Sequence, residues 1–329
     1  MVIQLADEKG QQIRALLDAE LDAELNAGGM DFELVVDANT DTDIKEGYRI
    51  FIEGTEIGGF LGNVVSNTAS EKITWNGYTW RGMMAHKIIL PPPGQDHYEV
   101  NGELNTILRE LVNSQFDGVI KAKNIDTGVN VKFKFDRFCT LLDGITKMLK
   151  SVNYRLEIKY NVGKPNGSGW VDIEAVPVKD WSNEIELSQD SKLNFTITKK
   201  SNGVNHLVVG GKDDLQDRTV LHLYVQKDGS IGKTQYYKGI QEITEFYENT
   251  STDTADLENK AKEKLQSLMS TETFEMEVER LGIDIQIGDI IGGRDYRTGI
   301  TLRKPLENIV VVISNGTIKK EYKLEGEKT

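Results

Sequence analysis

Asp18-Ala-Glu-Leu-Asp-Ala-Glu-Leu25 fits the patterns of both a helix and a strand, and the choice between them determines how the first part of the chain folds. Its leucines recur at helical spacing, and its residue types favour a helix. Acidic and apolar residues nevertheless alternate strictly, which is the period of a strand with one solvated face. Asn26-Ala-Gly-Gly29 is a turn signal, and the alternation resumes from Phe32 to Val36. The flanking residues therefore predict a long β-hairpin.

The hairpin would have one acidic face. On a strand Asp18, Glu20, Asp22 and Glu24 all point to the same side. One interpretation is an ordinary solvated face, and the other is a negative strip that faces a channel. Like charges this close need water or a distant polyanion in front of them, and they do not suit a buried interface.

The rest of the chain predicts an α+β protein that is mostly β. Helices are expected at 78–90, 102–116, 141–150 and 254–269, where apolar residues recur on one face. The expected domains are a β-rich part at 1–78, with strands from 170–190 as a candidate completion, an α/β insertion at 79–169, and a second β-rich part at 190–329. Thr140 and Asp143 have capping-box spacing at the start of the third helix.

Composition limits the classes of function. The 329 residues have a formal net charge of -13, and an acidic surface disfavours tight binding to nucleic acid. Cys139 is the single cysteine, so an internal disulfide or a zinc site of several thiolates is excluded. The N-terminus lacks the features of a signal peptide, and no stretch approaches the roughly 20 apolar residues that span a bilayer. We expect no membrane association.

Two glycine-rich blocks, Trp75–Gly94 and Ile287–Ile300, contain no nucleophile with a base, no metal-ligand cluster and no phosphate loop. The histidines also lack a partner at helical or hairpin spacing, and structural roles are expected for all of them: His86, His97, His206 and His222. The sequence therefore predicts no catalytic residue, cofactor or metal, and a protein that is not an enzyme.

Three blocks resemble the tail hub proteins of siphophages, within the wider group of baseplate and tail-tip hubs. They are Thr79-Trp-Arg-Gly-Met-Met-Ala-His-Lys-Ile-Ile-Leu-Pro-Pro-Pro-Gly94, the segment Val204–Tyr224 with its Gly210-Gly211 turn, and Ile287–Ile300 with Gly292-Gly293. They occur in the expected order and span nearly the whole chain.

The resemblance implies two related β-barrel-like tube domains with an inserted α/β region. It also implies a homotrimeric ring that joins a sixfold tail tube to a threefold tip and lets DNA or the tape-measure protein pass. Asp18, Glu20, Asp22 and Glu24 would then be candidate channel-lining residues. A negative lining offers no sites to which phosphates would adhere.

The implied partners are the tail tube protein, distal tail or tail-tip proteins and the tape-measure protein, and the implied location is a virion tail assembled in the host cytoplasm. The aromatic interface candidates, each with ordinary core packing as the alternative, are Trp75, Trp80, Trp170 and Tyr296. Arg294 and Asp295 are further interface candidates, which would pair either across a turn or across a subunit contact. Two other functions stay open, a tail-associated peptidoglycan-degrading enzyme and a carbohydrate-binding adhesion module. The chain ends soon after its last predicted strand, so no lytic domain is expected at that end.

Overall fold

A computed structural model describes residues 2–26, 31–164, 167–182, 194–212, 218–249, 254–278, 284–294, 299 and 301–324. The chain forms two units. Unit 1 comprises residues 1–196 and 275–327, and unit 2 comprises residues 197–274. This division differs from the expected three parts, because the last strands of the chain return to the unit that contains its first strands.

The largest element of the fold is an open sheet of twelve described strands, to which both ends of the chain contribute. The first part of the chain provides β1 (Ile3–Ala6), β2 (Gln12–Leu16), β3 (Glu20–Asn26), β4 (Asp31–Asp37), β5 (Arg49–Phe51), β6 (Gly58–Ser66) and β7 (Lys72–Thr79). The last part provides β13 (Asn194–Lys200), β18 (Thr271–Val278), β19 (Ile290–Arg294), β20 (Thr301–Ser314) and β21 (Thr317–Leu324). The strand order is β13-β18-β21-β20-β3-β4-β7-β6-β5-β1-β2, with β19 paired to β20.

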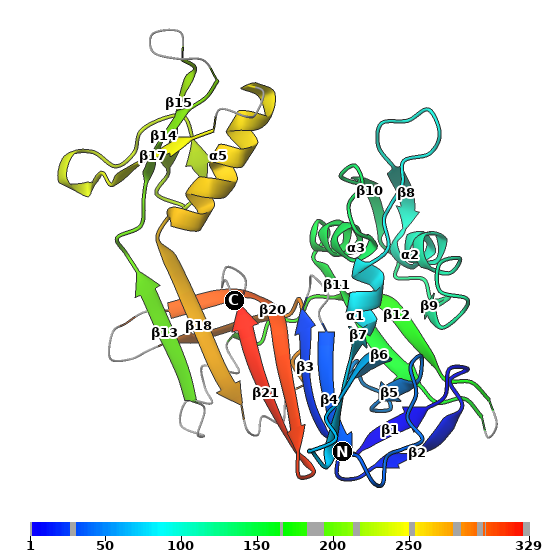
Figure 1. The fold of residues 1–329 in the computed structure, drawn as a ribbon. Coiled ribbons are helices and arrows are strands. Elements are labelled where there is room, and N and C mark those ends of the chain that lie inside the picture. Colours follow the sequence, from blue (N-terminus) through cyan, green and yellow to red (C-terminus); the bar gives the residue numbers. More distant parts are fainter. Residues whose placement is uncertain are drawn as a thin grey trace. The chain divides into compact units, whose positions relative to one another are not determined.

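The two parts of this sheet meet where β3 pairs with β20, so blue and red-orange strands lie side by side in Figure 1. Leu21, Ala23 and Leu25 of β3 are buried and alternate with the acidic residues. They lie opposite Ile313, Val311 and Ile309 of β20, which are also buried. The predicted hairpin is therefore confirmed, and the helical alternative for residues 18–25 is wrong. Burial of the alternating apolar side chains outweighs the intrinsic helix propensity of the segment.

Phe32 of β4 explains two glycines in the neighbouring strands. A Cβ atom at Gly59 would lie 2.1 Å from the carbonyl oxygen of Tyr78 and 2.7 Å from the Phe32 ring. A Cβ atom at Gly77 would lie 1.9 Å from the carbonyl oxygen of Phe60. The ring therefore packs over backbone that has no side chain in its way.

The α/β insertion lies within unit 1 and has its own core. It contains α1 (Trp80–Ala85), α2 (Leu104–Val112) and α3 (Leu141–Lys150). Its strands are β8 (Glu99–Glu103), β9 (Ile120–Ala122), β10 (Asn130–Lys134), β11 (Tyr154–Asn161) and β12 (Trp170–Pro177). β12 lies beyond the expected end of the insertion at 169, and it pairs with β11 and β9, so it does not complete the first β-rich part as expected. β8 pairs with β10, and β11-β12-β9 form a second small sheet. The apolar stripes of α2 and α3 are buried against these strands.

Two helix starts follow from capping side chains. Thr140 caps α3, and its hydroxyl accepts a hydrogen bond from the backbone N–H of Asp143, as the capping-box spacing predicts. Glu103 caps α2, and its carboxylate accepts hydrogen bonds from the N–H groups of Asn105 and Thr106. Both helices thereby satisfy backbone donors that have no partner within the helix.

The helix expected at 78–90 is shorter than predicted. It ends at Ala85, and Ile88 forms an antiparallel bridge with Thr140. Ile89 is buried in the insertion core while Ile88 and Leu90 are exposed. The chain is therefore already extended before the prolines.

Unit 2 is a four-stranded sheet with one helix against it. The strands are β14 (His206–Gly210), β15 (Val220–Val225), β16 (Ile231–Gly232) and β17 (Thr244–Glu248), in the order β16-β15-β14-β17. A 3-10 turn, η3 (Gly239–Gln241), precedes β17, and the helix is α5 (Thr254–Leu268). Leu207, Val209 and Leu223 form its core with Leu257, Ala261 and Leu265 of α5.

The predicted class, α+β and mostly β, is confirmed. The described strands form open sheets, however, and none of these sheets closes into the barrel-like domains that were expected. Among the described residues, no helix is long and apolar enough to cross a membrane.

Candidate functional site

The acidic residues of β3 form one face of the large sheet. Glu20, Asp22 and Glu24 alternate with buried residues, and Asp22 is exposed. Asp18 is also exposed but precedes the strand, so it is not part of the same ladder. The strand therefore holds three of the four predicted channel-lining residues on one side.

Neighbouring strands add acids that the sequence analysis did not include. Glu33 of β4 is directly opposite Asp22 and is also exposed. In β20 Val310 lies opposite Glu24 on one side and Glu321 of β21 on the other. Directly opposed residues share a face, so Glu33 and Glu321 belong to the acidic face. The alternation after Phe32 could have identified Glu33, whereas Glu321 requires the pairing of strands far apart in the sequence.

The acidic face is only partly neutralised. Lys72 Nζ lies 3.1 Å from Glu20 Oε1, with both side chains about half exposed, and the Asn308 amide donates to Glu24. Asp22 and Glu33 oppose each other as like charges, an arrangement that usually destabilises a strand pair. Lys319, which is exposed opposite Val312, and Lys323, opposite Asn308, lie on the same face beside Glu321. The like charges are therefore concentrated where Asp22 of β3 faces Glu33 of β4.

The interface candidates have different surroundings. Trp80 is fully buried in the insertion core and Trp75 is 8% exposed, so core packing accounts for both. Trp170 is half-buried; its Nε1 donates to Asp172 at 2.9 Å, and Lys121 Nζ lies 4.3 Å from its ring centroid. Asp295 and Tyr296 lie outside the described residues, as does the side chain of Arg294.

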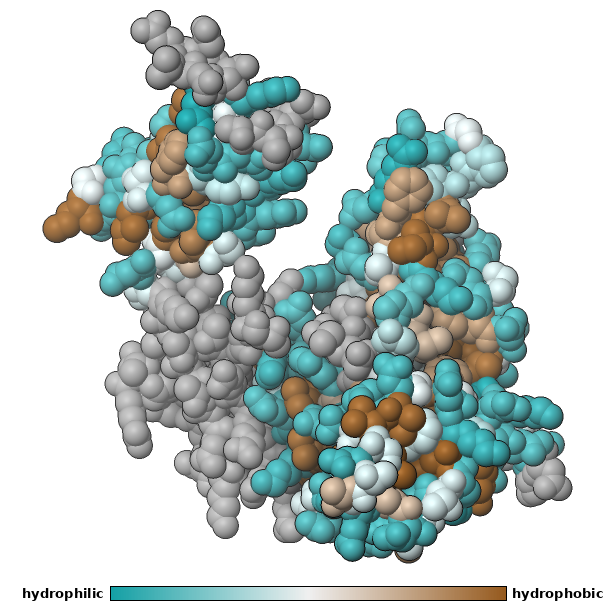
Figure 2. Space-filling model, viewed as in Figure 1, coloured by the Kyte–Doolittle hydropathy of each residue, from teal (hydrophilic) through white to brown (hydrophobic). Residues whose placement is uncertain are grey.

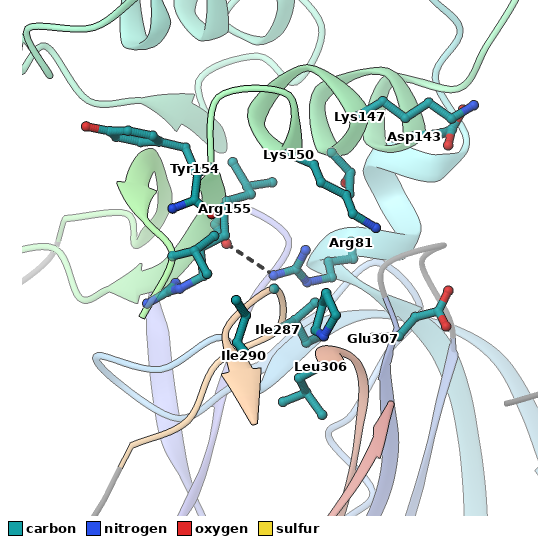
Figure 3. Close-up of a pocket in the computed structure, with 16 residues that line it drawn as sticks. Arg81, Asp143, Lys147, Lys150, Tyr154, Arg155, Ile287, Ile290, Leu306 and Glu307 are labelled. Atoms are coloured by element: carbon teal, nitrogen blue, oxygen red, sulfur yellow. Dashed lines mark hydrogen bonds and ion pairs between the residues drawn. The ribbon is translucent and has the colours of Figure 1, made fainter. Parts of the chain in front are cut away.

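A pocket of about 520 Å³ lies between the insertion and the C-terminal strands of unit 1. Figure 3 shows Lys150 of α3 on one side of Arg81 and the apolar side chains of Ile287 and Leu306 on the other. The Arg81 guanidinium donates to Glu56 at 2.5 and 3.0 Å and to the Leu156 carbonyl at 3.3 Å.

Lys147 and Asp143 of the pocket lining form an ion pair. Lys147 lies 2.9 Å from Asp136 and 3.0 Å from Asp143, and these hydrogen bonds raise the pKa of its ammonium above the usual value. The described lining contains neither histidine nor cysteine. The pocket therefore has the character of an interface between two parts of unit 1 and not that of a catalytic site.

Asp289 is the residue at this joint that the sequence analysis missed. It is fully buried and accepts hydrogen bonds from Arg155 Nε at 2.7 Å, Lys179 N at 3.0 Å and Trp181 Nε1 at 3.1 Å. The only sequence signal is an acidic residue after Gly288 among isoleucines. Its role depends on an arginine far away in the chain.

The histidines lie in two settings. His86 packs on Tyr78 with ring centroids 4.4 Å apart, and His97 Nδ1 lies 3.0 Å from the Phe135 carbonyl oxygen. His206 and His222 come together across β14 and β15, which their sequence spacing did not predict. The described residues contain no group of three or more side chains that could hold a metal ion.

No protein-family model matches the chain, and no curated protein matches it. Among solved structures, the chain is similar to the 43 kDa tail protein of prophage MuSo2 from Shewanella oneidensis, with a TM-score of 0.53, 14% identity and 98% of both chains covered.

Two further structures align at lower TM-scores. The tail protein from Neisseria meningitidis MC58 has a TM-score of 0.48 and 15% identity, with 99% of this chain and 97% of that chain covered. The prophage tail protein gp18 from Listeria monocytogenes EGD-e has a TM-score of 0.48 and 10% identity, with 100% and 96% covered. Because the similarity to the Shewanella protein runs through nearly all of both chains, this chain has the fold of a phage tail protein.

Proposed function

We propose that this protein is a structural hub of a phage tail or a phage-tail-like particle. In this proposal three copies form a ring that joins the sixfold tail tube to the threefold tip. DNA or the tape-measure protein passes through the ring, and the chain itself catalyses no reaction.

The observation that supports this proposal most is the open sheet that unites the first and last strands of the chain and has one acidic face. An open sheet presents unpaired backbone groups at its edges, and these invite pairing with another chain. The order of the described strands ends at β13 on one side and at β2 on the other. A ring of several copies would provide partners for such edges.

The β1–β2 edge also exposes apolar side chains. Val2, Ile13 and Leu17 are 42%, 43% and 72% exposed, and Figure 2 shows hydrophobic residues at the surface around this hairpin. Val2 and Leu17 flank the paired residues Ile3 and Leu16, so they lie next to each other. Apolar surface gathered on one edge is typical of a contact between proteins.

The acidic face would suit the lining of the passage. Asp22, Glu33 and Glu24 repel phosphate groups, so a polyanion can move past them without a favoured stopping point. The cross-strand repulsion between Asp22 and Glu33 would then be retained for this purpose and not for stability.

The proposed partners are the tail tube protein, distal tail or tail-tip proteins and the tape-measure protein, and the proposed location is the virion tail. Trp170 remains a proposed contact residue because part of its ring is accessible. The protein would be assembled into the tail in the host cytoplasm.

Mass measurement by light scattering and negative-stain images of the native particle test the proposal. A threefold ring with a central hole would support it, whereas a single copy per particle would contradict it. Zymography on cell wall and binding to a glycan array test the enzymatic and adhesive alternatives. Clearing that disappears when one acid is replaced, or glycan binding at exposed aromatic residues, would count against a purely structural hub.

A further inference from the structure

The outer face of the unit 2 sheet holds a histidine pair to which the proposed function gives no role. His206 begins β14, and His222 lies in β15 opposite Val208. Because residues two apart on a strand share a face, both histidines lie on the side of the sheet opposite Leu207 and Val209. Those leucine and valine side chains pack on α5, so the histidines face away from the helix.

The two imidazole rings meet edge to edge. His206 Nε2 lies 2.9 Å from His222 Nδ1. On its other side, His206 Nδ1 lies 2.6 Å from Glu242 Oε1 and 3.2 Å from the Thr244 hydroxyl. Tyr224 stacks on the His206 ring with centroids 4.3 Å apart. The position of the His206 ring is therefore fixed on two edges and one face.

The carboxylate of Glu242 decides which nitrogen of His206 is available. A carboxylate only accepts hydrogen bonds, so in the neutral ring Nδ1 of His206 donates to it and Nε2 keeps its lone pair. That lone pair points at Nδ1 of His222, so the Nδ1–H of His222 donates the hydrogen bond between the two rings. For Nδ1 to bind an ion, this proton moves to Nε2 of His222, which leaves the imidazole neutral and frees the Nδ1 lone pair. A carboxylate behind a histidine, with the opposite ring nitrogen free to coordinate, is the arrangement that orients histidine ligands in metal sites.

We propose that His206 Nε2 and His222 Nδ1 bind a divalent transition-metal ion of the class of Zn²⁺ or Ni²⁺, with Glu242 orienting His206. Imidazole nitrogen suits these ions. Two nitrogens at about 2.0–2.1 Å from a tetrahedral ion are roughly 3.3 Å apart. Because the His206 ring is fixed and its lone pair points at Nδ1 of His222, an ion on that lone pair requires Nδ1 of His222 to move sideways by about 2 Å. Rotation of the His222 side chain can supply this movement because His222 is exposed.

The surroundings define the kind of site. His206 is 9% exposed, so the ion would be reached from the side of His222. The described residues offer no third protein ligand in this cluster, so water or a donor from another molecule would complete the coordination. Such a site is open and exchangeable, unlike a closed structural zinc site with four protein ligands.

Zn²⁺ titration of the full chain by calorimetry tests the proposal, at a pH about one unit above the ordinary histidine pKa of about 6.5. We expect one ion per chain. His222→Gln replaces an exposed side chain and should leave the fold intact, which circular dichroism verifies, and it should weaken Zn²⁺ binding at least tenfold. His86→Gln is the matched control, since His86 is also exposed but lies in unit 1, and it should bind as the unchanged protein does.

Glu242→Gln separates a positioning role from a ligand role. An amide can still accept a hydrogen bond from His206 Nδ1 but raises the basicity of Nε2 less, so the affinity should fall by about 10–100-fold while one ion still binds. Equal affinity in His222→Gln and the unchanged protein would overturn the proposal. So would the absence of Zn²⁺ binding to the unchanged protein.

Discussion

Nε of Arg155 donates a 2.7 Å hydrogen bond to Oδ1 of Asp289, and the two side chains are only 5% and 0% exposed. Arg155 is the second residue of β11 in the insertion, whereas Asp289 immediately precedes β19 near the other end of the chain. The only other acid recorded near the Arg155 guanidinium among the described residues is Glu157, 3.7 Å from Nη2. This ion pair therefore ties the insertion to the C-terminal strands inside unit 1.

Replacing Asp289 should destabilise unit 1 strongly. Asp289→Asn leaves the Arg155 charge buried without its closest counterion, and removal of one partner of a buried pair costs about 3–5 kcal/mol. All tryptophans of the chain lie in unit 1, namely Trp75, Trp80, Trp170 and Trp181, so urea unfolding followed by tryptophan fluorescence reports on this unit.

Arg303→Gln is the control for this pair. Arg303 pairs with Asp180 at the surface and is 60% exposed, so its loss should change the unfolding free energy by no more than about 1 kcal/mol. Similar small losses in both variants would show that the Arg155–Asp289 bond does not hold the insertion in place.

Gly59→Ala should destabilise the large sheet, whereas Gly62→Ala in the same strand should not. A methyl group at Gly59 would lie 2.1 Å from the Tyr78 carbonyl oxygen, while at Gly62 the nearest atom is 3.5 Å away. Overpacking of this kind costs about 1–3 kcal/mol. Urea unfolding of the two variants measures the difference, and equal stability would mean that Phe32 and its neighbours can move aside.

Glu103 should make unit 1 sensitive to acid. Burial raises the pKa of Glu103, but hydrogen bonds from Thr127, Asn105 and Thr106 outweigh it and lower the pKa from 4.5 to about 2. A lowered pKa in the folded state means that the carboxylate stabilises the fold above pH 4.5 and that this contribution is lost as the pH falls toward 2.

The difference in unfolding free energy between the unchanged protein and Glu103→Gln should therefore decrease as the pH falls from 4.5 toward 2. Urea midpoints at several pH values measure it. A constant difference between the two proteins would contradict the assigned pKa.

Leu17→Glu should prevent assembly without unfolding the chain. Leu17 is 72% exposed at the β1–β2 edge, so a charge there leaves the core intact but would be buried in the proposed contact between copies. Leu90→Glu is a matched control, because Leu90 is 66% exposed but lies in the insertion. Incorporation into particles measures the effect, and equal incorporation of both variants would exclude the β1–β2 edge from the ring contact.

Reversing the charge of the acidic face should slow the passage of DNA more than it impairs the assembly of particles. Asp22→Lys combined with Glu33→Lys places two cations at the centre of the face, where phosphates would then bind and pause. We expect particles to form and DNA release to become slower, with the defect relieved by salt. Glu99→Lys in the insertion is the control, and release at the normal rate in the double variant would separate the acidic face from the passage.

Local pattern predicted those parts of the fold that depend on neighbouring residues. The alternation in 18–25 predicted β3, and the spacing of Thr140 and Asp143 predicted the start of α3. The turn at Asn315-Gly316 likewise depends only on neighbouring residues, since both adopt positive φ angles, 52° and 71°, that this dipeptide tolerates.

Contacts between residues far apart in the sequence could not be predicted from local patterns. The pairing of β3 with β20 joins the two ends of the chain, so the large sheet could not be assigned to one sequence interval. Asp289 and Arg155 are far apart in the sequence and form their hydrogen bond only in the folded chain. His206 lies beside His222 because β14 pairs with β15 in a register that places His222 opposite Val208. The site residues that were missed are those whose partners lie on other strands.

In the proposed hub, the acidic face of β3 and β4 lines a passage shared by several copies. Electron cryomicroscopy of the native particle tests this most directly. We predict three copies around the tail axis, with Asp22 and Glu33 facing the central hole. A single copy per particle, or a ring with these two residues on its outer surface, would contradict the account.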